Sequence, residues 1–156
     1  MLNIRQAKEK DIPVVLDLLH QVLEVHAVIR PDLFISGTTK YTEPELKEIL
    51  ADRDRPLFVA EENGEVVGYC FCILEHTTQG NNKRENKTLF IDDLCVDEKY
   101  RGQHIGRQLT DFVTAFAREI GCYDITLNVW EGNDAALNFY RSSGFTARKT
   151  VMEKLL

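Results

Sequence analysis

Apolar residues recur along this chain at the spacings of helices and strands, and these spacings predict most of its elements. A first helix is expected after Asp11, a suitable N-cap, with Pro13 in its first turn. Its apolar residues fall on one face, made of Ile12, Val15, Leu16, Leu19 and Leu23. Thr42 and Glu45 have the spacing of a capping box, so a second helix is expected to begin there.

Short apolar runs separated by turn residues predict the strands. Asn63-Gly64, a pair typical of a tight hairpin turn, joins two of these runs. The polar segment 79–87 is expected to be an exposed loop. Strands are expected at residues 2–5, 57–61, 66–74, 89–96, 124–129 and 147–155, with further helices from Ile105 to about Gly121 and after Asn133.

The predicted order is therefore strand, two helices, three strands, helix, strand, helix, strand. That order gives an α/β or α+β class without deciding between them. A chain of 156 residues with 44% hydrophobic residues is long enough for one adequate core, so we expect a single domain over residues 1–156. No internal repeat or linker interrupts it.

Composition narrows the possible partners. The formal net charge is −6, and no basic patch suggests nucleic acid; the acidic balance favours cationic substrates or serves only solubility. The four cysteines show no paired zinc spacing, so we expect reduced packing residues and no metal: they are Cys70, Cys72, Cys95 and Cys122. With no leader and no apolar stretch that would span a bilayer, a cytoplasmic protein without a membrane partner is expected.

The segment between the expected strand at 89–96 and the helix from Ile105 predicts an anion site. A basic turn with glycines, Gly102 and Gly106, leads into a helix start, where free backbone N–H groups and the positive helix end coincide. We expect the glycines to let a phosphate approach the backbone closely. Arg107 and Gln108 follow Gly106, so this is not a nucleotide P-loop, and the dinucleotide fingerprint is also absent.

This segment resembles the acyl-CoA pyrophosphate loop of the GNAT superfamily of N-acetyltransferases, whose pattern is Gln/Arg-x-x-Gly-x-Gly/Ala. Arg101 and Gly106 match its first and last positions, and His104 stands where the family usually has its middle glycine. A second block, from Asn133 to Phe145, is similar to the family's Asn-x-x-Ala-x-x-Phe-Tyr-x-x-x-Gly-Phe signature at every specified position.

The resemblance implies a GNAT-like fold: a mixed, mostly antiparallel sheet with helices on both faces. It also implies acetyl-CoA as co-substrate, no metal, and a primary amine as acceptor. The residues that it places along the cofactor are Leu94, Cys95, Val96, Arg101, Gly102, Gln103, His104, Ile105, Gly106, Arg107, Asn133 and Tyr140. Asn133 also suits the N-cap of its helix.

Acetyl transfer needs a neutral amine, a polarised carbonyl and a proton for the departing thiolate. The Tyr140 phenol carries a proton near neutral pH and suits the last task; the alternative is a packed aromatic ring. Asp92 and Asp93 interrupt an apolar strand, and adjacent strand residues face opposite sides. We therefore expect only one, with a slight preference for Asp92, to bind the amine or take its proton.

The wall of the acceptor site should come from the segment between the first two helices, where the candidates are Glu24, His26, Asp32 and Tyr41. The acceptor could be a polyamine-like or aminoglycoside-like molecule, a protein N-terminus or a lysine; the acidic residues favour a small cationic amine. The alternative function is a non-catalytic acyl-CoA-binding or regulatory module. A homodimer is possible, although no interface is evident in the sequence.

Overall fold

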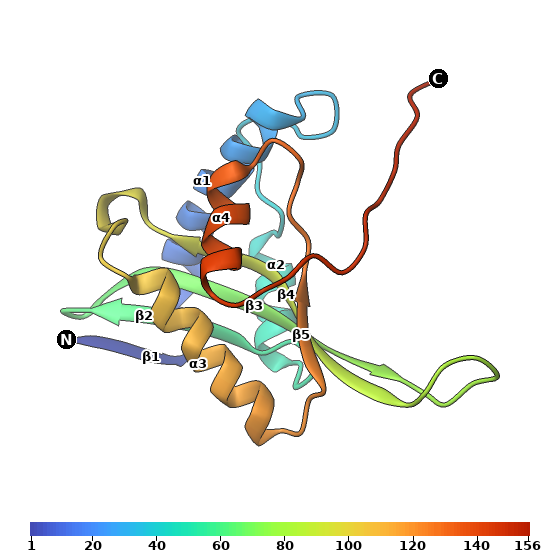
Figure 1. The fold of residues 1–156 in the computed structure, drawn as a ribbon. Helices are drawn as coiled ribbons and strands as arrows, with labels where there is room; N and C mark the ends of the chain where they lie inside the picture. The colour runs from blue at the N-terminus through green and yellow to red at the C-terminus, as the bar shows by residue number, and fades with distance from the viewer.

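The sheet has five strands that lie side by side in the order in which they occur in the chain. The computed structural model describes all 156 residues. All neighbouring strands are antiparallel except β4 and β5, which are parallel. The strands are β1 (Leu2–Gln6), β2 (Leu57–Glu62), β3 (Glu65–Thr77), β4 (Asn86–Val96) and β5 (Asp124–Leu127) (Figure 1).

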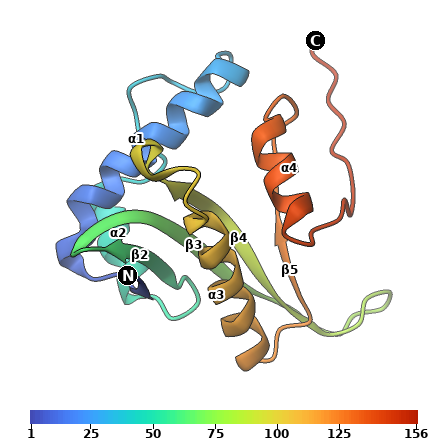
Figure 2. The same cartoon turned by 60° about the vertical axis from the view of Figure 1, so that its left-hand side comes forward.

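Helices cover both faces of this sheet (Figure 2). One face packs against α1 (Ile12–Ile29) and α2 (Glu43–Ala51), and the other against α3 (Ile105–Glu119); α4 (Asp134–Ser142) follows β5. Two short 3-10 turns, Glu9–Asp11 and Glu98–Tyr100, precede α1 and α3. The expected class, a mixed and mostly antiparallel sheet between helices, is confirmed.

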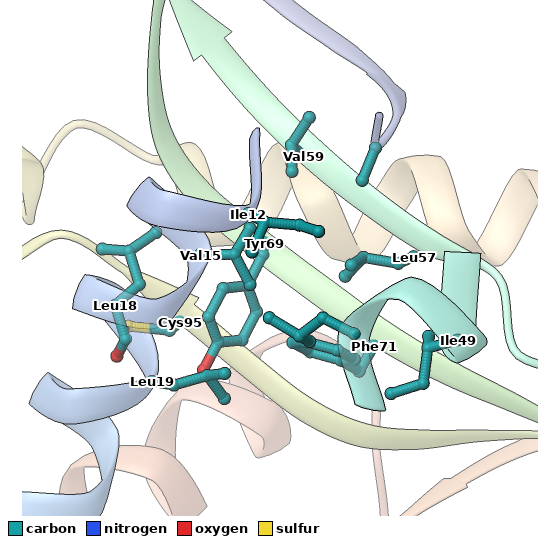
Figure 3. Packing of buried hydrophobic residues seen from close by; sticks show 12 residues of the cluster. Ile12, Val15, Leu18, Leu19, Ile49, Leu57, Val59, Tyr69, Phe71 and Cys95 are labelled. Carbon is teal, nitrogen blue, oxygen red and sulfur yellow. The ribbon is translucent and has the colours of Figure 1, made fainter. Parts of the chain in front are cut away.

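Two buried clusters, one on each face, hold the layers together. Tyr69 and Phe71 of β3 pack edge to face with ring centroids 4.9 Å apart, beneath α1 and α2 (Figure 3). On the other face, Leu109 and Val113 of α3 are fully buried against β3 and β4. The apolar residues that recur at helical spacing in the sequence therefore face the sheet. Burial of these side chains provides the main stabilisation of the fold.

A β-bulge interrupts β4 at the two adjacent carboxylates. Phe71 of β3 is opposite Asp93, but the next residue of β3, Cys72, is opposite Ile91, so Asp92 is the extra residue. Ile91 and Leu94 consequently both face α3, and Asp92 and Asp93 between them both point toward α1 and α2. The expectation that the two carboxylates face opposite sides is wrong, because strict alternation fails at a bulge.

β4 and β5 separate after a short parallel pairing. The pairs run from Thr88 with Asp124 to Ile91 with Leu127, where β5 ends. Beyond that point β4 continues through residues 92–96 without a partner strand on this side. β5 is shorter than the expected 124–129, and its early end opens the sheet between β4 and the segment that leads to α4.

Other boundaries also differ from the sequence prediction. The hairpin of β3 and β4 extends beyond the main sheet, so part of the expected loop at 79–87 is strand (Figure 1). Helix α1 continues past His26 to Ile29. The strand expected at 147–155 is absent: the tail after Phe145 is extended and exposed, with no secondary structure. A strand-like pattern of apolar residues does not produce a strand where no neighbouring strand supplies hydrogen bonds.

One helical stretch, Glu9–Ile29, is long and apolar enough to cross a membrane by length and composition, with a mean hydropathy of 1.6. This corrects the expectation that no stretch of that kind exists. In the structure, however, Val15, Leu18 and Leu19 of this stretch are buried against the sheet. In this stretch, 33% of the 18-residue apolar window is buried, so the core of the fold accounts for part of its apolar character.

Candidate active site

A cleft of about 1090 Å³ lies where β4 and β5 separate. The bulge and residues 93–96 of β4 form its floor, and the start of α3 closes one end. The segment after β5 and helix α4 form one wall, and the second half of α1 contributes to the other. The cleft therefore runs from the predicted anion site to the carboxylates.

The turn before α3 has the properties of an anion site. None of the backbone N–H groups from Arg101 to Arg107 donates a hydrogen bond within the chain. They precede an α-helix of 15 residues, whose positive end adds to the same field. The Arg107 guanidinium is held nearby by the Ser142 carbonyl at 3.2 Å. A phosphorylated group suits this end of the cleft.

The two glycines of the turn have different roles. Gly102 has φ +79°, a conformation that L side chains rarely adopt. At Gly106 an added Cβ would lie 3.2 Å from the Phe139 ring, so this glycine permits α3 to approach α4. We expected both glycines to let a phosphate approach the backbone. For Gly106 this is revised, because the Phe139 ring fills the space where its side chain would be.

His104 occupies the place of the family's middle glycine with a glycine-like backbone. Its φ is 61° in the left-handed region, and it is the N-cap of α3. The residue is exposed, and its side chain makes no capping hydrogen bond. A non-glycine residue in this conformation keeps the turn in shape at a modest conformational cost.

Helix α4 carries Tyr140 to the middle of the cleft. Asn133 caps this helix by accepting a hydrogen bond from the Ala136 N–H at 3.3 Å, as expected. Tyr140 packs between the rings of Phe139 and Phe145, and its hydroxyl makes no hydrogen bond within the chain. Burial, with the nearby Cys70 and Asp93, raises the Tyr140 pKa, so the phenol keeps its proton at neutral pH.

The two carboxylates have different partners although they face the same side. Asp92 accepts hydrogen bonds from the Tyr41 hydroxyl and from the Lys40 ammonium, the latter at 2.9 Å. Asp93 accepts one from the Tyr69 hydroxyl at 2.9 Å. Both carboxylates line the cleft, so the structure brings them together there with Tyr140.

Asp93 differs from an ordinary carboxyl in its protonation. Burial is the largest influence and raises its pKa to about 6, against the opposing effects of Lys40 and the Tyr69 hydrogen bond. Burial and the Asp92 hydrogen bond raise the pKa of Tyr41 well above its usual value. Burial likewise raises the pKa of the Cys95 thiol to about 12, so this thiol is uncharged. With a pKa of about 6, Asp93 changes its protonation state closer to neutral pH than an ordinary carboxyl does.

Most of the residues that the sequence predicted along the cofactor line this cleft. Of the residues predicted to bind the acceptor, some lie at the cleft and others lie outside it. Among the residues predicted along the cofactor, Gln103 alone does not line it. His26 does, whereas Tyr41 reaches the site through its bond to Asp92. Glu24 is held by the Ser36 hydroxyl at 2.7 Å, and Asp32 pairs with Arg30 at 2.7 Å, both outside the cleft.

Three residues of the site were not identified from the sequence. Lys40 lines the cleft with its ammonium on Asp92. Phe34 and Trp130 meet edge to face at 5.4 Å and form an aromatic wall with His26, which lies 5.2 Å from Phe34. Trp130 is the single tryptophan and lies three residues before the second motif, which was the one available signal. Lys40 and Phe34 lie in a segment without periodicity.

A cleft with free backbone N–H groups at one end, and with two carboxylates and a tyrosine among its lining residues, suits an enzyme that binds a phosphorylated co-substrate. Residues 22–145 match the family model of the acetyltransferase (GNAT) family. The chain belongs to this family and is an acetyltransferase enzyme. The general reaction of the family is acetyl transfer from acetyl-CoA to an amine.

Individual relatives agree with this assignment. Thialysine N-epsilon-acetyltransferase of Bos taurus is 27% identical over 151 residues, covering 90% of this chain and 82% of the relative. The probable glucosamine 6-phosphate N-acetyltransferase of Drosophila melanogaster is 26% identical; the match covers 94% of this chain and 61% of the relative.

Among solved structures, a tetramutant of the BH1408 protein from Bacillus halodurans superimposes with a TM-score of 0.95 and 30% identity over 99% of both chains. The aminoglycoside acetyltransferase meta-AAC0020, from an uncultured soil metagenomic sample, has a TM-score of 0.76 at 23% identity and shares the fold. That match covers 99% of this chain and 95% of the other.

Proposed function

We propose that this enzyme transfers the acetyl group of acetyl-CoA directly to a primary amine within a ternary complex. The observation that carries the proposal is the single cleft that joins the free N–H groups of residues 101–107 to Asp92, Asp93 and Tyr140. A cofactor with a pyrophosphate and a long arm fits such a cleft, since the donors face its phosphate end and residues 94–96 of β4 lie along its floor. Acetyl-CoA, once bound there, supplies the activated acyl group.

Proton transfer is assigned to three side chains. In this proposal Asp92 holds the acceptor's ammonium, Asp93 takes up the proton that the amine must lose, and Tyr140 donates one to the departing thiolate. The raised pKa of Tyr140 supports its role as donor, because the phenol is protonated at neutral pH. The pKa of Asp93, about 6, supports the role of acceptor, because the carboxyl is mostly ionised at neutral pH.

For the acceptor we infer a small cationic amine with an aliphatic chain. The Lys40 ammonium, 2.9 Å from the Asp92 carboxylate and 3.2 Å from its carbonyl oxygen, supports a site complementary to alkylammonium groups. The aromatic wall of Phe34 and Trp130 suits the chain or the charge of such a molecule. The Bos taurus relative is named for an acceptor of this kind, a lysine analogue. Within a cell, we expect this chemistry in the cytoplasm.

The test is an acceptor screen that measures release of the CoA thiol from acetyl-CoA. Lysine analogues, polyamines, amino sugars and peptides with a free N-terminus or lysine should be compared at one concentration. We expect turnover with one class of cationic amine, and an acetylated product of the matching mass. Tight binding of acetyl-CoA without thiol release for any amine would contradict the proposal and favour the non-catalytic module.

A further inference from the structure

Tyr69 is a tyrosine at a position where packing alone needs only a phenylalanine. The residue is 0% exposed, and its ring packs against Phe71 in the cluster beneath α1 and α2 (Figure 3). Phe71 lies two residues further along β3 on the same face, and its side chain fills the cluster without a polar atom. Taking a hydroxyl out of water costs free energy unless the hydroxyl makes a hydrogen bond. The Tyr69 hydroxyl therefore requires a partner inside the protein.

That partner is the Asp93 carboxylate. The Tyr69 hydroxyl donates a hydrogen bond to Asp93 Oδ2 at 2.9 Å, and Asp93 accepts a hydrogen bond from no other side chain. Because Oδ2 is held in this way, Oδ1 is the carboxylate oxygen that remains for an acceptor in the cleft, which Asp93 lines. Tyr69 itself does not line the cleft. It therefore acts on the site through Asp93.

The register of β3 against β4 brings the two side chains together. Phe71 is opposite Asp93, and Tyr69 precedes Phe71 by two residues on the same face. Tyr69 and Asp93 are therefore diagonal neighbours, a separation that a long aromatic side chain spans. A second tyrosine has the same relation to the other carboxylate: the Tyr41 ring lies 5.4 Å from Phe71, and its hydroxyl donates to Asp92. Each carboxylate thus has a phenol donor of its own.

We propose that Tyr69 is a positioning residue of this enzyme: its hydroxyl holds the Asp93 carboxylate toward the cleft, in the ionised form that accepts a proton. The inference rests on the proposed function, in which Asp93 takes up the proton of the amine. A hydrogen bond donated to a carboxylate stabilises its ionised form relative to its neutral form. Without this donor, the buried Asp93 carboxyl would keep its proton to a higher pH, and Oδ2 would lose its partner.

Several titratable groups surround Asp93. Burial raises the pKa of Asp93 to about 6; Lys40 and the Tyr69 hydrogen bond oppose this rise, and Asp92 adds to it. His26 of α1 lines the same cleft, and burial, with a further effect of Lys40, lowers its pKa. The neighbouring phenols and thiols have raised pKa values and stay uncharged at neutral pH: they are Tyr41, Tyr69, Cys70, Cys95 and Tyr140. A measurement on the Asp93 carboxyl itself is therefore needed beside kinetics.

The first experiment follows the Asp93 carboxyl by NMR in protein with isotope-labelled aspartate, and its signal is assigned by its absence from Asp93→Asn. Tyr69→Phe keeps the ring and removes only the hydroxyl, so the titration midpoint of Asp93 should rise by about one pH unit. Tyr41→Phe, which removes the hydroxyl bound to the neighbouring Asp92, is the matched control and should move this midpoint far less. The measurement needs neither an acceptor nor turnover. An unchanged midpoint in Tyr69→Phe, or an equal shift in Tyr41→Phe, would overturn the proposal.

The second experiment measures kcat/KM against pH with the amine found in the acceptor screen. The ascending limb should move to higher pH in Tyr69→Phe, so that kcat/KM falls about tenfold near pH ~5 and changes little above pH ~8. In an Asp93→Asn background, Tyr69→Phe should cause no further loss of kcat, whereas a residue that served packing alone would add its own loss. Additive losses would overturn the positioning role. A raised NMR midpoint without a shifted limb would confirm that Tyr69 sets the state of Asp93 and would refute Asp93 as the base, so the two failures are distinguishable.

Discussion

At the scale of single residues, a β-bulge in β4 places two adjacent carboxylates in the candidate site. A regular strand would have directed one of them into the opposite core. The bulge adds one residue to β4, so Asp92 and Asp93 both line the cleft, and each has its own hydroxyl partner. Two carboxylates on one side allow binding and proton transfer to be divided between them.

Replacing Tyr140 by phenylalanine should lower kcat by about a hundredfold or more and leave the KM for acetyl-CoA nearly unchanged, because only the proton donor is lost. The ring and its packing against Phe139 and Phe145 remain. Steady-state kinetics measures the effect, and Tyr123→Phe, an exposed tyrosine outside the cleft, is the control. Wild-type turnover in the Tyr140 variant would return this residue to a packing role.

Asp93→Asn should remove an ascending limb from the pH profile of kcat/KM. The carboxylate form accepts the proton, so activity in the wild type should rise with pH through about 6. Asp92→Asn should raise the KM of the amine and keep that limb, since its carboxylate binds the ammonium. An unchanged profile in the Asp93 variant would exclude Asp93 as the base.

The Asp93→Asn variant should also differ from the wild type in how its free energy of unfolding depends on pH. The folded-state pKa of about 6 lies above the ordinary value of 3.8, so the folded protein binds more protons in that interval. This contribution to the free energy of unfolding therefore falls as pH rises from about 4 to about 6. Relative to wild type, Asp93→Asn should gain stability over that range in denaturant titrations; a constant difference would argue against a raised pKa.

Lys40 should compete with a cationic acceptor, because its ammonium already occupies the Asp92 carboxylate. Lys40→Met keeps most of the length of the side chain and removes the charge, so the KM of a cationic amine should fall several-fold. Lys47→Met, which removes a similarly exposed lysine outside the cleft, is the matched control. A higher KM in the Lys40 variant would show that this lysine assists acceptor binding instead.

At the scale of elements, the approach of α3 to α4 sets the width of the cleft. Gly106 is the point of contact, because the Phe139 ring lies where a Cβ would be. The helices that carry the anion-binding turn and Tyr140 therefore meet where Gly106 faces the Phe139 ring, and also through the hydrogen bond from the Arg107 guanidinium to the Ser142 carbonyl. β5 contributes by ending early, which leaves residues 92–96 of β4 open to the cleft.

Gly106→Ala tests this contact. The added Cβ would lie 3.2 Å from the Phe139 ring, so the ring or α4 must shift by a few tenths of an ångström. We expect this strain to outweigh the gain, up to about 1 kcal/mol, that alanine brings over glycine in a helix, so the free energy of unfolding should fall. Acetyl-CoA affinity should also fall. Gly80→Ala, at a glycine with open space around it, should change neither quantity. Equal stability of the two variants would show that α4 is less closely fixed to α3 than the structure indicates.

At the scale of the whole molecule, the ligand and the fold are linked. Acetyl-CoA should bind the folded state and not the unfolded state, because the turn and the cleft exist only when β4, β5, α3 and α4 are assembled. At a concentration of a hundred times its Kd, it should stabilise the protein by about 2.7 kcal/mol. Thermal melts measure this shift. Acetyl-pantetheine, which lacks the pyrophosphate, should stabilise far less; an equal shift would contradict the role of residues 101–107.

The sequence by itself predicted the four helices and the five strands that the structure contains, together with a sixth strand at 147–155 that it lacks. Helical spacing identified the core faces of α1 and α3, the capping box located α2, and Asn63-Gly64 located the hairpin. Tyr140 and the layout of the sheet came from the resemblance to the family, whereas the basic glycine turn before a helix indicated the anion site through a short, local pattern. These signals depend on neighbours in the chain, so no tertiary information was needed to interpret them.

The tertiary structure alone decided how distant segments meet. The bulge at Asp92 depends on register against β3, and the bond between Lys40 and Asp92 joins residues far apart in the chain. Gly106 faces a ring from another helix. The tail has the pattern of a strand but has no neighbouring strand in its own chain to pair with. Pairing and side-chain contact are properties of two segments at once, and the pattern of either segment alone does not contain them.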